Sequence, residues 1–162
     1  MEREAERTEV TERVEAFLRA SGVPFRLYAH PPAFTSEESA RVRGTAPEEG
    51  AKALVIKAGE EFYLAVISGV RRADNRALRR ILGTRVARFA TEEELLRLTG
   101  CRPGAVPPLG NLFGLPMLMD ESLRRCEHVS FNAGSNSWSV TMRREDLERV
   151  VQPRVCAFAA EP

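Results

Sequence analysis

Two apolar runs joined by a short polar turn constrain the fold of this chain more than any other feature. Residues 51–57 and 62–67 are largely apolar on both alternating faces and rich in β-branched side chains, and a glycine-containing turn at 58–61 joins them. A strand that is apolar on both faces is typically buried on both faces. The two runs therefore predict a central β-hairpin that the rest of the chain covers.

Two lysines interrupt the first apolar run. On a strand, Lys52 shares a face with Leu54 and Ile56, whereas Lys57 lies on the opposite face. Lys57 stands beside the exposed turn, so Lys52 is the lysine expected at the mouth of a mostly apolar cavity. A cation there costs desolvation energy, which favours an anionic partner or a functional role. The alternative is a lysine at a strand end that extends its amine into solvent.

Length and composition indicate one domain. A chain of 162 residues that is 43% hydrophobic can bury one core, so we expect a single domain over 1–162 with its core at about 10–151. The 24 Lys and Arg residues balance 23 Asp and Glu residues, so nucleic-acid contact would need a local basic patch. Three unpaired cysteines, a charged N-terminus and the lack of a membrane-length apolar stretch predict a cytoplasmic protein without a membrane span.

Helical and strand periodicities follow one another along the whole chain. Apolar spacing and capping residues predict helices over 8–21, 35–42, 75–82, 91–98 and 143–151. Beyond the hairpin, strands are predicted over 23–30, 85–89, 116–119, 127–131, 138–142 and, at an edge, 155–158, with a turn at 132–136. The fold class predicted is α+β, with a mixed, largely antiparallel sheet that curls into a barrel-like form and helices packed outside it.

Two further stretches stand out by composition. Residues 100–110 contain so many glycines and prolines that they predict a stiff loop whose backbone N–H groups are free to face a ligand. Arg72, Arg76, Arg79 and Arg80 fall on one flank of the predicted helix near 75–82 and form a local basic face. Such faces are more often solvated than bound to nucleic acid.

Nucleophilic and metal chemistry have weaker support in the sequence. Cys126 and His128 share a strand face but lack a third group to orient them as a nucleophile and its base. The cysteines and histidines also lack the paired short spacings of a zinc site, and no glycine motif for nucleotide phosphates is present. We therefore expect neither a metal nor a cofactor.

Five short motifs stand in an order that one known family shares. They are His30-Pro31-Pro32 with Thr35, Lys52-Ala53-Leu54, Gly104-Ala105-Val106-Pro107-Pro108 with Gly110, Asp120-Glu121-Ser122-Leu123, and Asn132-Ala133-Gly134. Together they resemble the YbaK/EbsC family, the aminoacyl-tRNA synthetase-associated or prolyl-tRNA-synthetase-like editing domain, over roughly 10–151. The resemblance implies a YbaK-like fold and trans-editing, in which the ester between a wrong amino acid and its tRNA is hydrolysed.

The resemblance also implies roles for individual residues. Lys52, which would bind the tRNA 3′ end, and Gly104, in the loop that would hold the ester, are the candidate catalytic residues. The candidate substrate-binding residues are His30, Thr35, Ala105, Val106, Pro107, Pro108 and Gly134. Arg72, Arg76 and Arg79 are the candidate contacts to tRNA phosphates. Loop N–H groups would stabilise negative charge on the ester carbonyl oxygen, and no metal would be required.

The sequence leaves the substrate and the partner open. Ala105 and Pro107 stand where the family often has serine or threonine, so the amino acid could be Ala, Cys, Ser or Thr, on tRNA(Pro) or another tRNA. The implied partner is the acceptor end of a mischarged tRNA, and an aminoacyl-tRNA synthetase is a further candidate. The main alternative is a non-catalytic module that binds a tRNA end or a synthetase, and another is hydrolysis of a different small ester or amide. The oligomeric state is open.

Overall fold

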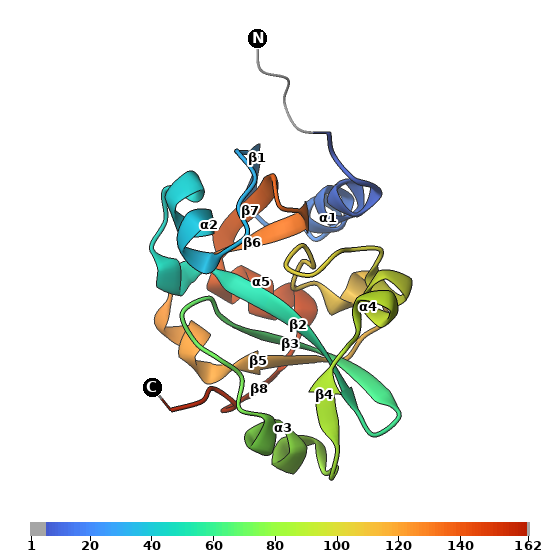
Figure 1. The fold of residues 1–162 in the computed structure, drawn as a ribbon. Helices are drawn as coiled ribbons and strands as arrows, with labels where there is room; N and C mark the ends of the chain where they lie inside the picture. Colours follow the sequence, from blue (N-terminus) through green and yellow to red (C-terminus); the bar gives the residue numbers. More distant parts are fainter. Residues whose placement is uncertain (1–5, 162) are drawn as a thin grey trace.

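The computed structural model describes residues 6–161 as a single α+β domain (Figure 1). Its helices are α1 (Glu9–Ala20), α2 (Ser36–Arg43), α3 (Asn75–Leu82), α4 (Glu92–Thr99) and α5 (Arg144–Val151). Its strands are β1 (Phe25–Ala29), β2 (Ala51–Ala58), β3 (Glu61–Ser68), β4 (Ala87–Phe89), β5 (Met117–Asp120), β6 (His128–Ser135), β7 (Trp138–Arg143) and β8 (Arg154–Cys156). Most of the charged N-terminal segment that argued against a signal sequence, residues 1–5, lies outside the described part.

The strands divide between two sheets, which corrects the prediction of one curled, barrel-like sheet. A three-stranded antiparallel sheet has the order β1-β7-β6, and a five-stranded mixed sheet has the order β4-β2-β3-β5-β8. Within residues 6–161, an isolated bridge between Gly50 and Ser130 is the one backbone pairing that joins them. The sheets stay separate because they pack on each other through apolar side chains, such as Val55 of β2 and Phe131 of β6, while β2 pairs with β3 and β4 and β6 pairs with β7.

The central hairpin β2–β3 is buried on both faces, as its two-sided apolar pattern predicts. Val55, Leu64 and Val66 pack into a core shared with β6, β7 and α1, while Ile56 and Ile67 pack on the opposite face against α3 and the C-terminal segment. In Figure 1 the three-stranded sheet and α1 lie on one side of β2 and β3, and α3 lies on the other. The hairpin thus forms the middle layer of the domain.

The predicted turn at 132–136 is too long. β6 continues to Ser135, and the pairing with β7 shifts register between Asn132 and Ser135, which marks a bulge. Gly134 has a φ of +80° there, a conformation that glycine adopts without steric cost. Strand pairing thus overrides the turn propensity of this Asn- and Gly-rich segment. Other predicted elements shift by one to three residues, including the edge strand, which is Arg154–Cys156 and parallel to β5.

Gly134→Ala is expected to lower the free energy of unfolding by about 3 kcal/mol, because an added Cβ would lie 2.7 Å from the Cβ of Val10 in α1. Gly22→Ala is the matched control, since Gly22 also has a positive φ but no atom within 4 Å of the added carbon. Strain alone should cost the control about 1 kcal/mol. Urea unfolding measures both, and equal losses would show that the contact with α1 adds nothing.

Every helix within 6–161 is too short or too polar to cross a lipid bilayer.

Candidate functional site

A cavity of about 210 Å³ lies between the start of β2, helix α2 and the glycine- and proline-rich loop. The residues lining it are Ala33, Phe34, Thr35, Ser36, Ser39, Ala40, Arg43, Thr45, Pro47, Gly50, Ala51, Lys52, Ala53, Leu54, Gly69, Pro103, Gly104, Val106, Asn132 and Asn136. This lining contains two cations, Arg43 and Lys52, and no Asp or Glu. The cavity therefore favours an anionic ligand.

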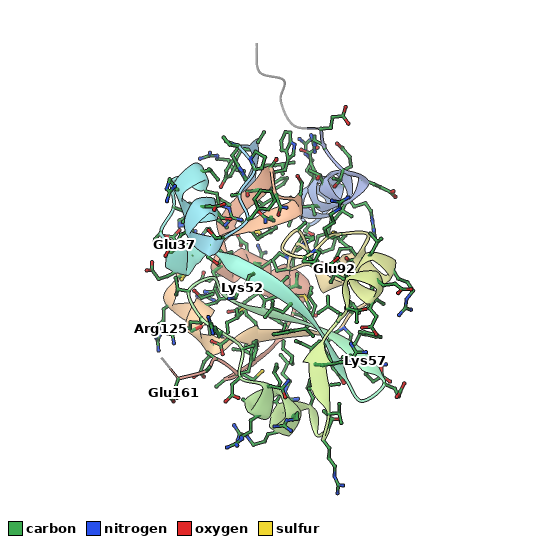
Figure 2. The ribbon with its side chains drawn as sticks, in the orientation of Figure 1. Glu37, Lys52, Lys57, Glu92, Arg125 and Glu161 are labelled. Carbon is green, nitrogen blue, oxygen red and sulfur yellow. The ribbon has the colours of Figure 1, made fainter. Side chains whose placement is uncertain are left out.

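Lys52 lines the cavity without a carboxylate partner among residues 6–161. Figure 2 shows it near the α2 end of β2, with Lys57 at the opposite end. Burial lowers the pKa of the Lys52 ammonium, and the nearby positive charge of Arg72 lowers it further. A desolvated cation beside a second cation is destabilised until an anion binds.

The loop at 103–108 has only three backbone N–H groups, and one of them is already paired. The N–H of Ala105 donates to the carbonyl of Arg102 at 3.0 Å, and the carbonyl of Ala105 accepts from the N–H of Gly134 at 2.9 Å. The prolines have no N–H to offer. The N–H groups of Gly104 and Val106 find no acceptor within the described part of the chain, and both residues line the cavity.

Thr35 stands at the rim of the cavity, where it begins α2. Its hydroxyl accepts the N–H of Glu38 at 3.1 Å and so caps the helix. Phe34 beside it is 75% exposed although it lines the cavity. Thr35 thus caps α2 in addition to lining the cavity.

Arg43 is a cavity residue that the sequence reading did not single out. It ends α2, where a cation usually only complements the helix dipole, so its sequence position carries no special signal. Its Nε donates to the Ser139 hydroxyl at 3.0 Å and its Nη2 donates to Oδ1 of Asn132 at 2.9 Å. Burial lowers the pKa of this guanidinium, whose partners are all neutral.

Asn132 belongs to the Asn132-Ala133-Gly134 motif, but the sequence assigned no role to its side chain. Its Nδ2 donates to the carbonyl of Gly104 at 2.6 Å. It therefore joins Arg43 of α2 to the loop across the cavity wall. Neither contact has a sequence signal, because the three residues are far apart along the chain.

His30 does not line the cavity. Its Nδ1 lies 2.8 Å from the carbonyl of Pro31, so this nitrogen carries the proton and donates. Its Nε2 is 2.7 Å from the hydroxyl of Ser139, which also contacts Arg43. Burial lowers the pKa of His30, and the positive charge of Arg43 acts in the same direction. A neutral His30 is thus linked to the cavity-lining Arg43 through the hydroxyl of Ser139.

The remaining candidate residues are not among those that line the cavity. Pro107 and Pro108 are buried, and the carbonyl of Ala105 accepts a hydrogen bond from the N–H of Gly134. Arg72 precedes α3 instead of lying on it, which corrects its predicted place on the helix flank. A separate surface hollow is lined by Arg76, Arg79, Arg80, Gly83, Thr84 and Arg85.

Metal-binding and thiol groups are not gathered at this site. No three His, Cys, Asp or Glu side chains within 6–161 come together in a way that could hold a metal ion. Cys101 is buried, and this burial raises the pKa of its thiol.

Comparisons with known proteins identify the family of this chain. Residues 30–150 match the family described as the aminoacyl-tRNA editing domain. The chain is 34% identical over 152 residues to the multifunctional Ser/Thr-tRNA deacylase ProXp-y of Escherichia coli K12, with 91% of each chain covered. It is 26% identical over 144 residues to the prolyl-tRNA editing protein ProX of Acetoanaerobium sticklandii, covering 85% of this chain and 88% of that protein.

A solved structure is similar as well. A crystal structure described as a candidate trans-editing enzyme for prolyl tRNA synthetase superimposes with a TM-score of 0.88 at 26% identity, over 96% of this chain and 100% of that one. The family match spans most of the chain, and the relative from Escherichia coli is aligned almost end to end. The resemblance carried by the motifs around Lys52 and Gly104 is thereby confirmed: the chain belongs to the aminoacyl-tRNA editing domain family.

Proposed function

We propose that this chain is an aminoacyl-tRNA deacylase that acts in trans, and that its cavity takes the aminoacylated 3′ end of a mischarged tRNA. One observation carries the proposal: a cavity with two cations and no carboxylate stands beside two backbone N–H groups that lack an acceptor within 6–161. The cations suit the phosphate and ribose oxygens of the tRNA end. The N–H groups suit an ester carbonyl.

The chemistry needs no nucleophile from the protein. Water adds to the ester carbonyl carbon, and the carbonyl oxygen becomes negatively charged. The N–H groups of Gly104 and Val106 stabilise that charge if they are already in place. The bond to the ribose oxygen then breaks, and this oxygen leaves with a proton that came from the water. The ribose 2′-hydroxyl of the substrate can hold the water for this attack.

The lining of the cavity supports a small, hydroxyl-bearing amino acid. The cavity of about 210 Å³ leaves little room for a long side chain once it also holds the ribose of the tRNA end. Thr35, Ser36 and Ser39 add hydroxyl groups that can pair with a substrate hydroxyl. Together with the name of the relative from Escherichia coli, this favours serine or threonine over alanine or cysteine as the residue removed.

The arginines near α3 are proposed to contact tRNA phosphates. Residues 71–85 contain six arginines and one acidic residue, Asp74, in a chain whose charges nearly balance overall. Arg72 is near enough to Lys52 to lower its pKa, so Arg72, Arg76 and Arg79 extend the positive charge of the cavity toward α3. Phosphate contacts of this kind give affinity without sequence preference. Action in the cytoplasm and a synthetase partner belong to the same proposal.

The test is deacylation of a panel of mischarged tRNAs bearing Ser, Thr, Ala or Cys, with Ala-tRNA(Pro) and Cys-tRNA(Pro) among them. Release of serine and threonine faster than of alanine is the expected result. Tight tRNA binding without hydrolysis of any member would overturn the proposal and favour a non-catalytic binding module. Equal hydrolysis of small amino acid esters that lack tRNA would indicate a general esterase.

A further inference from the structure

The side-chain amide of Asn132 bridges two groups that no other residue in the cavity wall connects. Its Nδ2 donates to the Gly104 carbonyl at 2.6 Å, and its Oδ1 accepts from Nη2 of Arg43 at 2.9 Å. A carbonyl only accepts and a guanidinium only donates, so these partners fix which way the amide faces. Aspartate could serve Arg43 but not Gly104, and an apolar side chain could serve neither.

Arg43 is itself held from several sides. Its Nε donates to Ser139, whose hydroxyl also meets Nε2 of His30 at 2.7 Å. Its Nη1 lies 3.5 Å from the carbonyl of Ser130. The guanidinium is therefore anchored to β6 and β7, and Asn132 takes its orientation from this anchor.

The bridge acts on the loop that carries the free N–H groups. The peptide between Gly104 and Ala105 is held at its oxygen by Asn132 and at its nitrogen by Arg102, and the next carbonyl is held by Gly134. Gly104 has a φ of +83° and lacks a side chain that would restrict it. Without Asn132, one of these three restraints is lost, and the adjacent N–H groups of Gly104 and Val106 can move.

We propose that Asn132, oriented by Arg43, is a positioning residue for deacylation: it fixes the Gly104 peptide so that the loop N–H groups face the ester carbonyl oxygen. This inference rests on the proposed deacylase function. It assigns to Asn132 an effect on the chemical step and not on tRNA binding, since Asn132 itself need not touch the substrate. A misplacement of about 1 Å at a reacting centre can cost roughly 100-fold in rate.

The test is Asn132→Asp, with Asn136→Asp as the matched control. Asn136 also lines the cavity, so both variants add the same negative charge there, but only Asn132 bonds to the Gly104 carbonyl. Aspartate at 132 keeps a partner for Arg43, so thermal unfolding should show an unchanged or raised Tm. Steady-state deacylation should show a raised KM for tRNA in both variants, and a fall in kcat of roughly 30- to 100-fold in Asn132→Asp alone.

Each outcome decides the inference. Equal kcat values for the two variants would overturn it, because the added charge alone would then explain any loss. If Asn132→Asp has a lowered Tm, Asn132→Ser replaces it in the test, since a serine is too short to reach Gly104 and adds no charge. A kcat of Asn132→Ser within threefold of wild type would then overturn the inference. A wild-type chain that hydrolyses no member of the tRNA panel would instead refute the deacylase proposal itself.

Discussion

Lys52→Met is expected to lower kcat/KM for deacylation of a mischarged tRNA by about 10²–10³-fold, the range found when a preorganised electrostatic contact to a reacting group is removed. Methionine is unbranched and only one atom shorter than lysine, and it removes the charge together with its N–H donors. The Lys52 ammonium is partly desolvated and lies near Arg72, so removing it should leave stability unchanged or slightly higher. A variant that folds at least as well and reacts far more slowly would mark the charge as functional.

The matched control is Lys57→Met, which removes the same charge from the other end of β2. Lys57 lies 5.7 Å from the ring of Phe62 and outside the cavity. Its kcat/KM should stay within threefold of wild type in the same deacylation assay. A comparable loss in both variants would mean that the general positive charge of the strand matters and not its place in the cavity.

Asp120→Ala is expected to lower the free energy of unfolding by about 3–5 kcal/mol, as for a buried charged group whose partners are left unpaired. Asp120 is 1% exposed. Its Oδ1 accepts the N–H groups of Phe158 at 2.9 Å and Ala159 at 3.0 Å, and its Oδ2 accepts the N–H and hydroxyl of Ser122. This carboxylate thus attaches the C-terminal segment to β5, and the buried ring of Phe158 depends on it.

Urea unfolding of Asp120→Ala beside Glu121→Ala tests this role. Glu121 is the exposed neighbour, and its replacement should change stability by less than about 0.5 kcal/mol. If Asp120→Ala stays within about 1 kcal/mol of wild type, the C-terminal segment is held by packing alone. Because Asp120 is not among the cavity-lining residues, deacylation by the folded fraction should be preserved.

Local patterns in the sequence predict most elements of the fold. The central hairpin follows from its two-sided apolar pattern, and α1 and α4 begin at Thr8 and Thr91, whose side chains cap them. These features depend on residues within a few positions of each other, so the sequence alone contains them. The division into two sheets and the extension of β6 through Gly134 depend on pairing between distant strands, and the sequence alone did not predict them.

The candidate site shows the same division. The sequence by itself determined that a lysine stands in an apolar strand and that residues 100–110 form a glycine- and proline-rich loop, because both are properties of short segments. Only the tertiary structure decided that Arg43 and Asn132 lie in the same cavity wall as Lys52 and Gly104. It also decided that His30 contacts Ser139 outside the cavity lining, and that Gly134 packs on α1. The physical reason is that a hydrogen bond between residues far apart in the chain depends on how the sheets and helices pack, which no local pattern records.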